Sequence, residues 1–258
     1  MTWLITPGQP VPMDPYLYTN TVLLLHGDGA NGSTTILDSS KVVGSPKTVT
    51  AVGNAQISTA QSKFGGASIA FDGTGDFLST PNNAAFDFGS GDLTIEAWVY
   101  IAANSTADVN GARGCSICNT WRTGSTDADL QGWTFTILGS TTTTGTALAF
   151  DTWNTPAATL YRATTTISQS TWHHVAATVA GGTRRLFLNG SLISGATTTI
   201  GSGYTQANVF ASTMRVGNTP NTGYPLPLNG YIDDLRITKG VARYTANFIP
   251  PTTSFPDH

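Results

Sequence analysis

The chain has 258 residues with 12 basic and 15 acidic side chains, so charged residues make up 10% of it and the net charge is −3. About 25% charged residues would be usual, and no cluster of Lys or Arg is present to bind a phosphate backbone or an anionic membrane surface. The composition argues against nucleic acid and lipid as partners, and no apolar run predicts a signal peptide or a membrane span.

The first 20 residues predict an extended arm. Four prolines lie between residues 7 and 15, and a proline lacks the backbone N–H that a strand ladder needs. The same segment carries apolar and aromatic side chains that are costly to leave in water. These are Trp3, Leu4, Ile5, Tyr16, Leu17 and Tyr18. We expect the arm to dock on its own domain or on a neighbouring chain.

The middle of the chain predicts strands. Runs of β-branched and aromatic residues are broken by Gly, Asn, Ser or Thr at intervals of roughly 8 to 12 residues, as in a sandwich or barrel. The clearest strand covers residues 93–101. Alternation places Leu93, Ile95, Ala97, Val99 and Ile101 on one face and Thr94, Glu96, Trp98 and Tyr100 on the other. Both faces carry bulky groups, which fits an aromatic-bearing surface or a strand covered on both sides.

The two cysteines, Cys115 and Cys118, form one C-S-I-C sequence. A structural zinc site usually needs four ligands, and the sequence offers no second pair or nearby histidine. We therefore expect free thiols, with a local disulfide as the alternative.

Turn signals organise the later part of the chain. Gly181-Gly182 and Asn189-Gly190 supply the positive φ angles of tight hairpins and predict a three-strand meander. A further strand over residues 230–238 would place Asp233 on the face of Leu235 and Ile237, where a carboxylate needs hydrogen-bond donors or a cation. The tail from residue 248 is proline-rich and predicted to be extended.

Several short segments occur in one order along the chain. They are Val22–Gly29, Lys63–Gly73, Gly75–Leu78, Gly91–Val99, Trp172–Ala176, Leu186–Gly190, Met214–Gly217 and Gly230–Ile237. In order and spacing they resemble the laminin-G-like (LamG, concanavalin A-like) domains that recur in bacteriophage structural proteins. The ending Gly240–Pro251 is similar to a variant found in phage virion and tail proteins.

This resemblance implies an all-β fold, a two-sheet antiparallel jelly-roll sandwich of about six or seven strands in each sheet. We expect residues 1–20 to form the arm, residues 21–247 the sandwich, and residues 248–258 an extended C-terminal tail. The fold group includes lectins, adhesion modules, glycosidases and capsid-surface proteins, so the fold itself implies no activity.

Catalytic chemistry is not predicted. Glycosidases of this architecture need two carboxyl groups about 5 to 9.5 Å apart. The chain contains a single glutamate, Glu96, and the Glu-x-Asp-x-x-Glu arrangement of the related glucanases is absent. We expect Glu96 to be a structural acid. A nucleophile elbow is also missing, and none of His26, His173, His174 and His258 completes a triad.

Two kinds of ligand site are predicted. Trp121, Trp133 and Trp153, with Tyr161, lie in the segment least like the family and are candidates for a sugar-stacking surface, although tryptophan is more often a core residue. The resemblance also implies a structural calcium ion, for which Asp28 and Asp233 are the candidates. The alternative is that Asp28 caps a turn and Asp233 accepts backbone N–H bonds.

The main functional hypothesis is a non-catalytic virion surface protein, either a capsid decoration or a tail-associated protein. On this hypothesis its terminal arms bind other virion proteins, and its exposed face is either inert or a contact surface for host glycans. A homo-oligomer is compatible with this role. A carbohydrate-binding adhesin is the alternative, and a glycoside hydrolase is a remote third.

Overall fold

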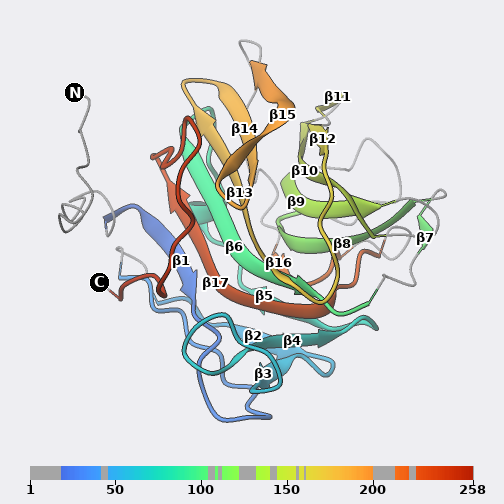
Figure 1. Cartoon of the computed structure of the whole chain (residues 1–258). Coiled ribbons are helices and arrows are strands. Elements are labelled where there is room, and N and C mark those ends of the chain that lie inside the picture. The colour runs from blue at the N-terminus through green and yellow to red at the C-terminus, as the bar shows by residue number, and fades with distance from the viewer. Residues whose placement is uncertain are drawn as a thin grey trace.

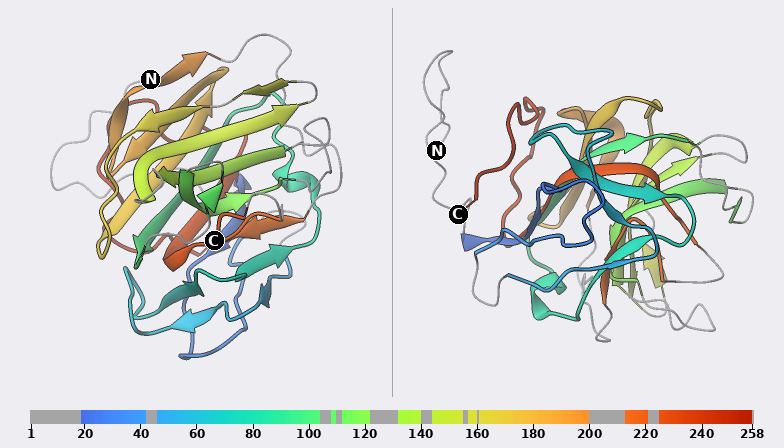
Figure 2. Two further views of the ribbon diagram at one scale, coloured as in Figure 1. Left: turned by 90° about the vertical axis from the view of Figure 1, so that its right-hand side faces the viewer. Right: turned by 90° about the horizontal axis from the view of Figure 1, so that it is seen from below.

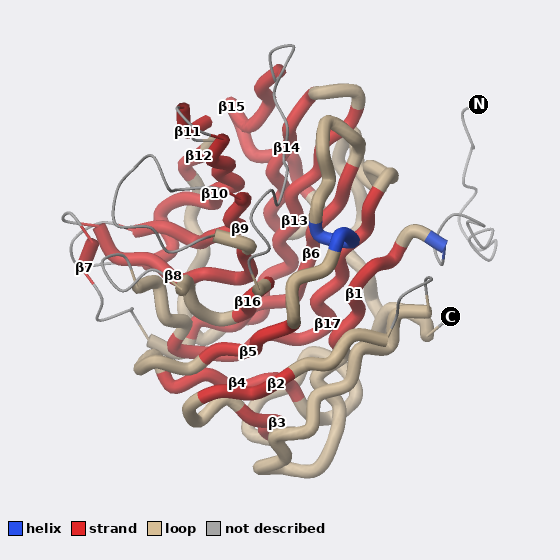
Figure 3. The backbone as a smooth tube through the Cα atoms, turned by 180° about the vertical axis from the view of Figure 1, so that it is seen from behind, coloured by secondary structure: helices blue, strands red, loops and turns tan. Residues whose placement is uncertain are grey.

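The computed structural model describes residues 19–41, 46–103, 108–109, 112–121, 132–139, 144–154, 157–159, 161–199, 213–220 and 225–257. In these ranges two antiparallel sheets pack face to face (Figure 1). Helix is confined to short turns such as Ala84–Phe86, as Figure 3 shows, and none of the described helical turns is long or apolar enough to cross a membrane. The predicted all-β sandwich is confirmed.

The first sheet has eight strands in the order β15-β14-β13-β6-β17-β4-β3, with β1 paired to β17. In that order the strands are Ser191–Thr199, Thr183–Leu188, Trp172–Ala180, Leu93–Ile101, Asn229–Lys239, Ser68–Asp72 and Gln56–Ser58, and β1 is Thr21–Leu25. The last strand, β17, therefore lies inside the sheet between β6 and β4.

The second sheet has nine strands in the order β11-β10-β9-β8-β16-β5-β2, with β12 paired to β10 and β7 paired to β8. In that order the strands are Ala157–Thr159, Thr144–Asn154, Gly132–Gly139, Ala112–Asn119, Met214–Val216, Phe77–Thr80 and Thr50–Val52; β12 is Arg162–Thr164 and β7 is Asp108–Val109. The left view of Figure 2 looks onto this sheet.

Strand β6 has the predicted bounds and faces. Its apolar residues Leu93, Ile95, Ala97, Val99 and Ile101 are all buried in the core between the sheets. The other face of β6 points away from the core, and we call this side of the eight-stranded sheet its outer face.

The predicted orientation of Asp233 in β17 is wrong, because this strand contains a β-bulge. The pairing of β17 with β6 shifts between Asp233 and Arg236, and Asp234 adopts a φ of 48°. The extra residue lets Leu235 and Ile237 face the core while Asp233 faces outward. Asp233 therefore does not share the face of Leu235 and Ile237, and no carboxylate has to enter the apolar core.

A second bulge places both cysteines on the core side of β8. The pairing of β8 with β9 shifts between Ser116 and Cys118. A spacing of three would place Cys115 and Cys118 on opposite faces of a regular strand, yet both lie in the core. Both are free thiols, as expected, and burial raises the pKa of Cys115 to about 12.

The predicted meander is present in β13, β14 and β15. Gly181 and Gly182 have φ angles of 52° and 75°, and Asn189 and Gly190 have φ angles of 50° and 78°. Paired positive φ angles match the right-handed twist of the flanking strands, which makes such two-residue hairpins compact.

Residues 240–257, which we call the C-terminal strap, run along the outer face of the eight-stranded sheet (Figure 1). The rings of Tyr244 and Phe248 stack with their centroids 3.5 Å apart. Both rings also meet Phe187 of β14 edge-on. The strap thus covers part of this face with aromatic side chains.

Candidate functional site

Three partly exposed aromatic side chains form a line across the outer face of the eight-stranded sheet. Trp172 pairs with Tyr100 between β13 and β6, and Tyr100 pairs with Tyr231 between β6 and β17. The ring centroid of Tyr100 lies 5.6 Å from that of Trp172 and 5.7 Å from that of Tyr231. We call these three residues the aromatic row.

Other segments cover the side chains next to the aromatic row on this face but leave the row itself partly exposed. The strap lies over Thr94, whose hydroxyl donates to the carbonyl of Val241 at 3.0 Å. The loop before β4 covers Trp98, against which Phe64 packs edge-on at 6.0 Å. The aromatic row is the next line of side chains on this face, and all three of its members are intermediate in exposure.

Two residues continue the row on the neighbouring strands. Ala70 of β4 pairs with Tyr231, and Gln56 of β3 pairs with Ala70; both are partly exposed. The row therefore ends in a small residue and an amide group. Ring faces that pack on C–H groups, beside an amide that can bond hydroxyl groups, form the mixed surface expected of a ligand site.

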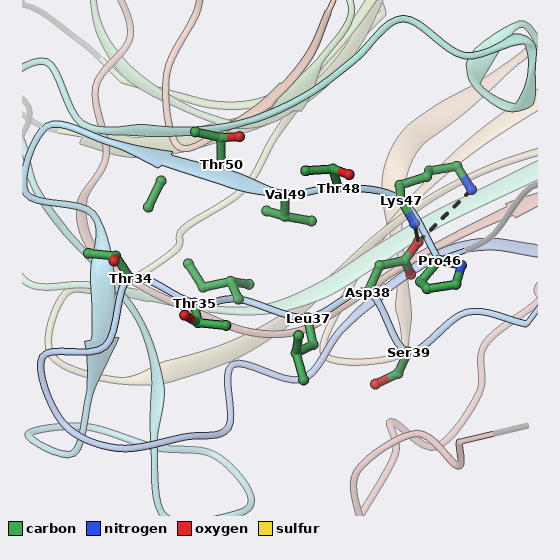
Figure 4. Close-up of a pocket in the computed structure, with 12 residues that line it drawn as sticks. Thr34, Thr35, Leu37, Asp38, Ser39, Pro46, Lys47, Thr48, Val49 and Thr50 are labelled. Carbon is green, nitrogen blue, oxygen red and sulfur yellow. Dashed lines mark hydrogen bonds and ion pairs between the residues drawn. The ribbon is translucent and has the colours of Figure 1, made fainter.

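A cavity of about 650 Å³ lies elsewhere, between residues 34–39 and residues 46–51 (Figure 4). Its lining is mostly threonine hydroxyls and aliphatic groups, including Leu37, which is 72% exposed. The volume is in the usual range for small-molecule sites.

The two charged residues at one end of this cavity, Asp38 and Lys47, already interact with other groups of the protein. Asp38 accepts backbone N–H bonds from Leu24, Ser40 and Lys47 at 2.8 to 3.0 Å. The ammonium group of Lys47 lies 4.0 Å from the same carboxylate, as the dashed line in Figure 4 marks. Because Asp38 and Lys47 satisfy each other, neither charge is left to orient a polar ligand.

Glu96 is a structural acid, as expected. Its side chain is fully buried, and Oε1 accepts two hydrogen bonds from Arg236 at 2.9 and 2.7 Å. The hydroxyl of Tyr244 donates to Oε2 at 2.8 Å, and His174 Nε2 lies 3.2 Å from Oε2. Burial alone would raise the pKa of Glu96, but the charge of Arg236 holds this pKa well below its usual range. The carboxylate is therefore ionised and closed off from any substrate.

Ser168, His173 and Asn189 have the composition of a hydrolytic triad but the wrong hydrogen bonding. Asn189 Oδ1 accepts from the backbone N–H of His174 at 3.0 Å, so its Nδ2 must donate to His173 Nδ1, 3.1 Å away. The imidazole proton then lies on Nε2 and points at Ser168 Oγ, 3.0 Å away. A serine nucleophile needs the opposite tautomer, in which Nε2 accepts its proton. Burial also lowers the pKa of His173, which favours this neutral form.

The structure corrects the predicted sugar-stacking surface. Trp133 is fully buried and donates its Nε1–H to the carbonyl of Phe86 at 3.0 Å. Tyr161 is 4% exposed and Trp121 is 7% exposed. Alternation along β9 places Trp133 on the core face, and none of these three rings offers an open face for a sugar. The fourth candidate, Trp153, belongs to β10, and its side chain lies outside the described residues.

The two predicted calcium ligands lie close together. Asp28 follows β1, which pairs with β17, the strand that carries Asp233. Burial and the negative charges of Asp234 and Asp28 raise the pKa of Asp233 to about 7. Its Oδ2 accepts from the N–H groups of Lys63 and Phe64, as the alternative expected. The described chain holds no group of three or more His, Cys, Asp or Glu that could bind a metal ion, so calcium stays a prediction.

The predicted partner-binding arm lies outside the described residues. Its members are Trp3, Leu4, Ile5, Tyr16 and Tyr18. Attachment through this arm therefore stays a prediction as well.

Sequence comparison identifies the family. A model described as the concanavalin A-like lectin/glucanases superfamily (Laminin_G_3) matches residues 72–243, about two thirds of the chain. The chain belongs to this superfamily. A search of curated protein sequences gave no match.

Solved structures agree on the fold of this superfamily member. The binding domain of Paraclostridial Mosquitocidal Protein 1 superposes with a TM-score of 0.59 at 18% identity, over 86% of this chain and 49% of that one. The binding domain of botulinum neurotoxin serotype D gives 0.58 at 16% identity, over 87% and 49%. Domain 4 of a GH43 extracellular arabinanase from Geobacillus stearothermophilus, in complex with arabinotriose, gives 0.56 at 16% identity, over 86% and 94%. The chain thus spans about half of each toxin chain and nearly all of the arabinanase domain.

The sequence points to one member of the aromatic row. Alternation along residues 93–101 places Tyr100 on the outer face, but Trp172 and Tyr231 come from distant parts of the chain. Their place beside Tyr100 depends on which strands pair and in what register, which no local pattern specifies.

Proposed function

We propose that this protein is a carbohydrate-binding module and that the aromatic row is its binding surface. The observation that carries the proposal is the alignment of three partly exposed rings across β13, β6 and β17. The rings of Tyr100 and Trp172 are tilted by 57°, and those of Tyr100 and Tyr231 by 77°. The three rings are therefore not coplanar, and each ring offers a face or an edge of its own to a sugar.

The superfamily and the fold support this proposal without deciding the ligand. One structure of similar fold holds arabinotriose, and the family description includes both lectins and glucanases. Binding without hydrolysis fits the closed environment of Glu96 and the tautomer of His173.

The test begins with a glycan array and continues with calorimetry on the best ligand. Trp172→Ala and Tyr231→Ala should each weaken binding at least about tenfold, or about 1.4 kcal/mol, because aromatic anchors dominate binding surfaces. Tyr231→Phe keeps the ring and should retain most of the affinity.

Two exposed apolar residues provide matched controls. Ile249→Ala, at an 86% exposed position in the strap, should leave binding unchanged. Leu37→Ala reports on the cavity of Figure 4. If Leu37→Ala abolishes binding and Trp172→Ala does not, the cavity is the binding site and the proposal fails for the aromatic row.

We also propose that the N-terminal arm attaches this module to a larger assembly, of which a virion is the example suggested by the resemblance to phage proteins. The supporting observation is the set of aromatic and aliphatic side chains in a proline-rich segment. Both roles are compatible, because a particle protein can carry a glycan-binding face.

A further inference from the structure

Arg215 differs from the other arginines whose side chains the structure describes. Each of the others has a protein acceptor: Arg162 bonds Asp151, Arg184 bonds Thr152, Arg236 bonds Glu96, Arg243 bonds Thr238, and Arg185 bonds the carbonyl of Thr183. Within the described residues the side chain of Arg215 has no hydrogen bond or ion pair, and its Nε is buried without an acceptor.

Strand pairing places Arg215 in a line of polar residues. Its neighbours in β16, Met214 and Val216, are fully buried in the core, so Arg215 projects from the opposite side of the nine-stranded sheet. It pairs with Ser79 of β5, which pairs with Thr50 of β2. Successive members of this line are about 4.8 Å apart, the spacing of neighbouring strands.

An aromatic ring holds the guanidinium in place. The central carbon of the Arg215 guanidinium lies 3.9 Å from the ring centre of Phe77, which shares this face of β5 with Ser79. Such stacking restricts the arginine and leaves the edge of the guanidinium available for hydrogen bonds. The hydroxyl groups of Ser79 and Thr50 face the same side, at partly exposed and exposed positions.

The guanidinium is partly desolvated in this position. Burial lowers the pKa of Arg215. A polar group that has lost water without gaining an acceptor costs free energy. A ligand that supplies an anionic acceptor would recover this cost, and a neutral ligand would recover less of it.

We propose that Arg215, the two hydroxyl-bearing residues in line with it and the Phe77 ring form a second binding site, for a sugar that carries a carboxylate. Two parallel guanidinium N–H groups match the two oxygens of a carboxylate. The hydroxyls of Ser79 and Thr50 bond sugar hydroxyls at the strand spacing, and the Phe77 ring packs against sugar C–H groups. This site lies on the other sheet from the aromatic row and does not depend on it.

The experiment is a ¹⁵N-¹H NMR titration of the full chain with D-glucuronate, and with D-glucose as the neutral counterpart. Glucuronate should shift amide signals of β5 and β16, and it should bind at least about tenfold more tightly than glucose. Arg215→Gln should remove this preference. Arg215→Lys, which keeps the charge but not the planar pair of donors, should keep part of it.

Arg185→Gln is the matched control, because it removes one positive charge from a partly buried arginine on the other sheet. It should leave glucuronate binding unchanged. Equal binding of glucose and glucuronate, an equal loss in Arg185→Gln, or signal changes confined to the aromatic row would each overturn the inference. Sulfate binding as tight as glucuronate binding would also overturn it, because the site would then recognise a simple anion and not a sugar.

Trp172→Ala separates this inference from the proposed function. If the inference is correct, this variant still binds glucuronate at β5 and β16, whatever happens to glycans on the aromatic row. The spectrum of each variant also shows directly whether the protein has folded.

Discussion

At the scale of single residues, a single buried carboxylate organises the outer face of the eight-stranded sheet. Glu96 lies on a central strand and is bonded by groups from β17 and from the strap. Arg236 belongs to β17, and Tyr244 belongs to the strap. One acid therefore connects three segments that are far apart in the sequence.

Replacement of this acid should be strongly destabilising. Glu96→Gln keeps the size of the side chain but leaves Arg236 and Arg243 buried near each other without a counter-charge. We expect the free energy of unfolding to fall by about 3–5 kcal/mol, as when one partner of a buried ion pair is removed. Urea denaturation measures the loss.

Asp72→Asn is the control for Glu96→Gln, because Asp72 is exposed and surface substitutions usually change stability by about 0.5 kcal/mol or less. A loss below about 1 kcal/mol in Glu96→Gln would show that the ion pair adds little to stability.

At the scale of elements, the sequence predicts what local patterns determine. The strand over residues 93–101 and the hairpins at residues 181–182 and 189–190 follow from alternation and turn chemistry, and the structure confirms them. The bulges in β8 and β17 were not predicted, because a bulge depends on the partner strand and on which side chains must avoid the core. The predicted position of Asp233 was wrong for this reason.

The strap ends in an interaction that depends on pH. His26, just after β1, lies between two carboxylates: Nδ1 is 2.5 Å from Asp234 and Nε2 is 2.7 Å from Asp257 of the strap. Burial alone would lower the pKa of His26, but the two carboxylates raise it from 6.5 to about 9. The contribution of this pair of contacts is therefore fully present below pH 6.5 and is lost as the pH rises through about 9.

We therefore expect the stability of the protein to decrease between pH 6.5 and 9. The raised pKa of Asp233 acts at lower pH. Stability should fall as the pH rises from about 3.8 to about 7, because the folded state holds this proton more tightly than the unfolded chain, and Asp233 adds no further slope above about pH 7. Urea unfolding between pH 6.5 and 9 measures the slope. Asp257→Asn removes one partner of His26 and should make the decrease smaller; an unchanged slope in this variant would show that the strap contact does not contribute.

At the scale of the whole molecule, the sequence identified the fold class but not the candidate binding surfaces. The two-sheet sandwich follows from strand spacing and from motifs in a fixed order, which many residues specify together. Both candidate surfaces depend on the register between distant strands. The local sequence around Trp172 or Arg215 does not show which residues of other strands lie beside them. Trp121 and Trp133 are buried, since large rings fill a core more often than they cover a surface.

The arm predicts how the molecule attaches to an assembly. Asn20 donates to the carbonyl of Lys239 at 2.9 Å and so belongs to the sandwich, which sets the deletion at residues 1–18. We expect this deletion to leave thermal unfolding nearly unchanged but to abolish loading onto particles that lack the protein. Mass photometry measures the loading, and full loading of the truncated protein would contradict the role of the arm.

The place of β17 has a consequence for synthesis on the ribosome. This strand is made after β6 and β4, yet both of them pair with it. Until it emerges, β6 and β4 each leave a row of backbone N–H and C=O groups open to pairing with another chain. Closure of the sheet must wait until β17 has been synthesised, and long-range pairing of this kind is intrinsically slow. The interval between the emergence of β4 and that of β17 is therefore when the nascent chain is most vulnerable to aggregation.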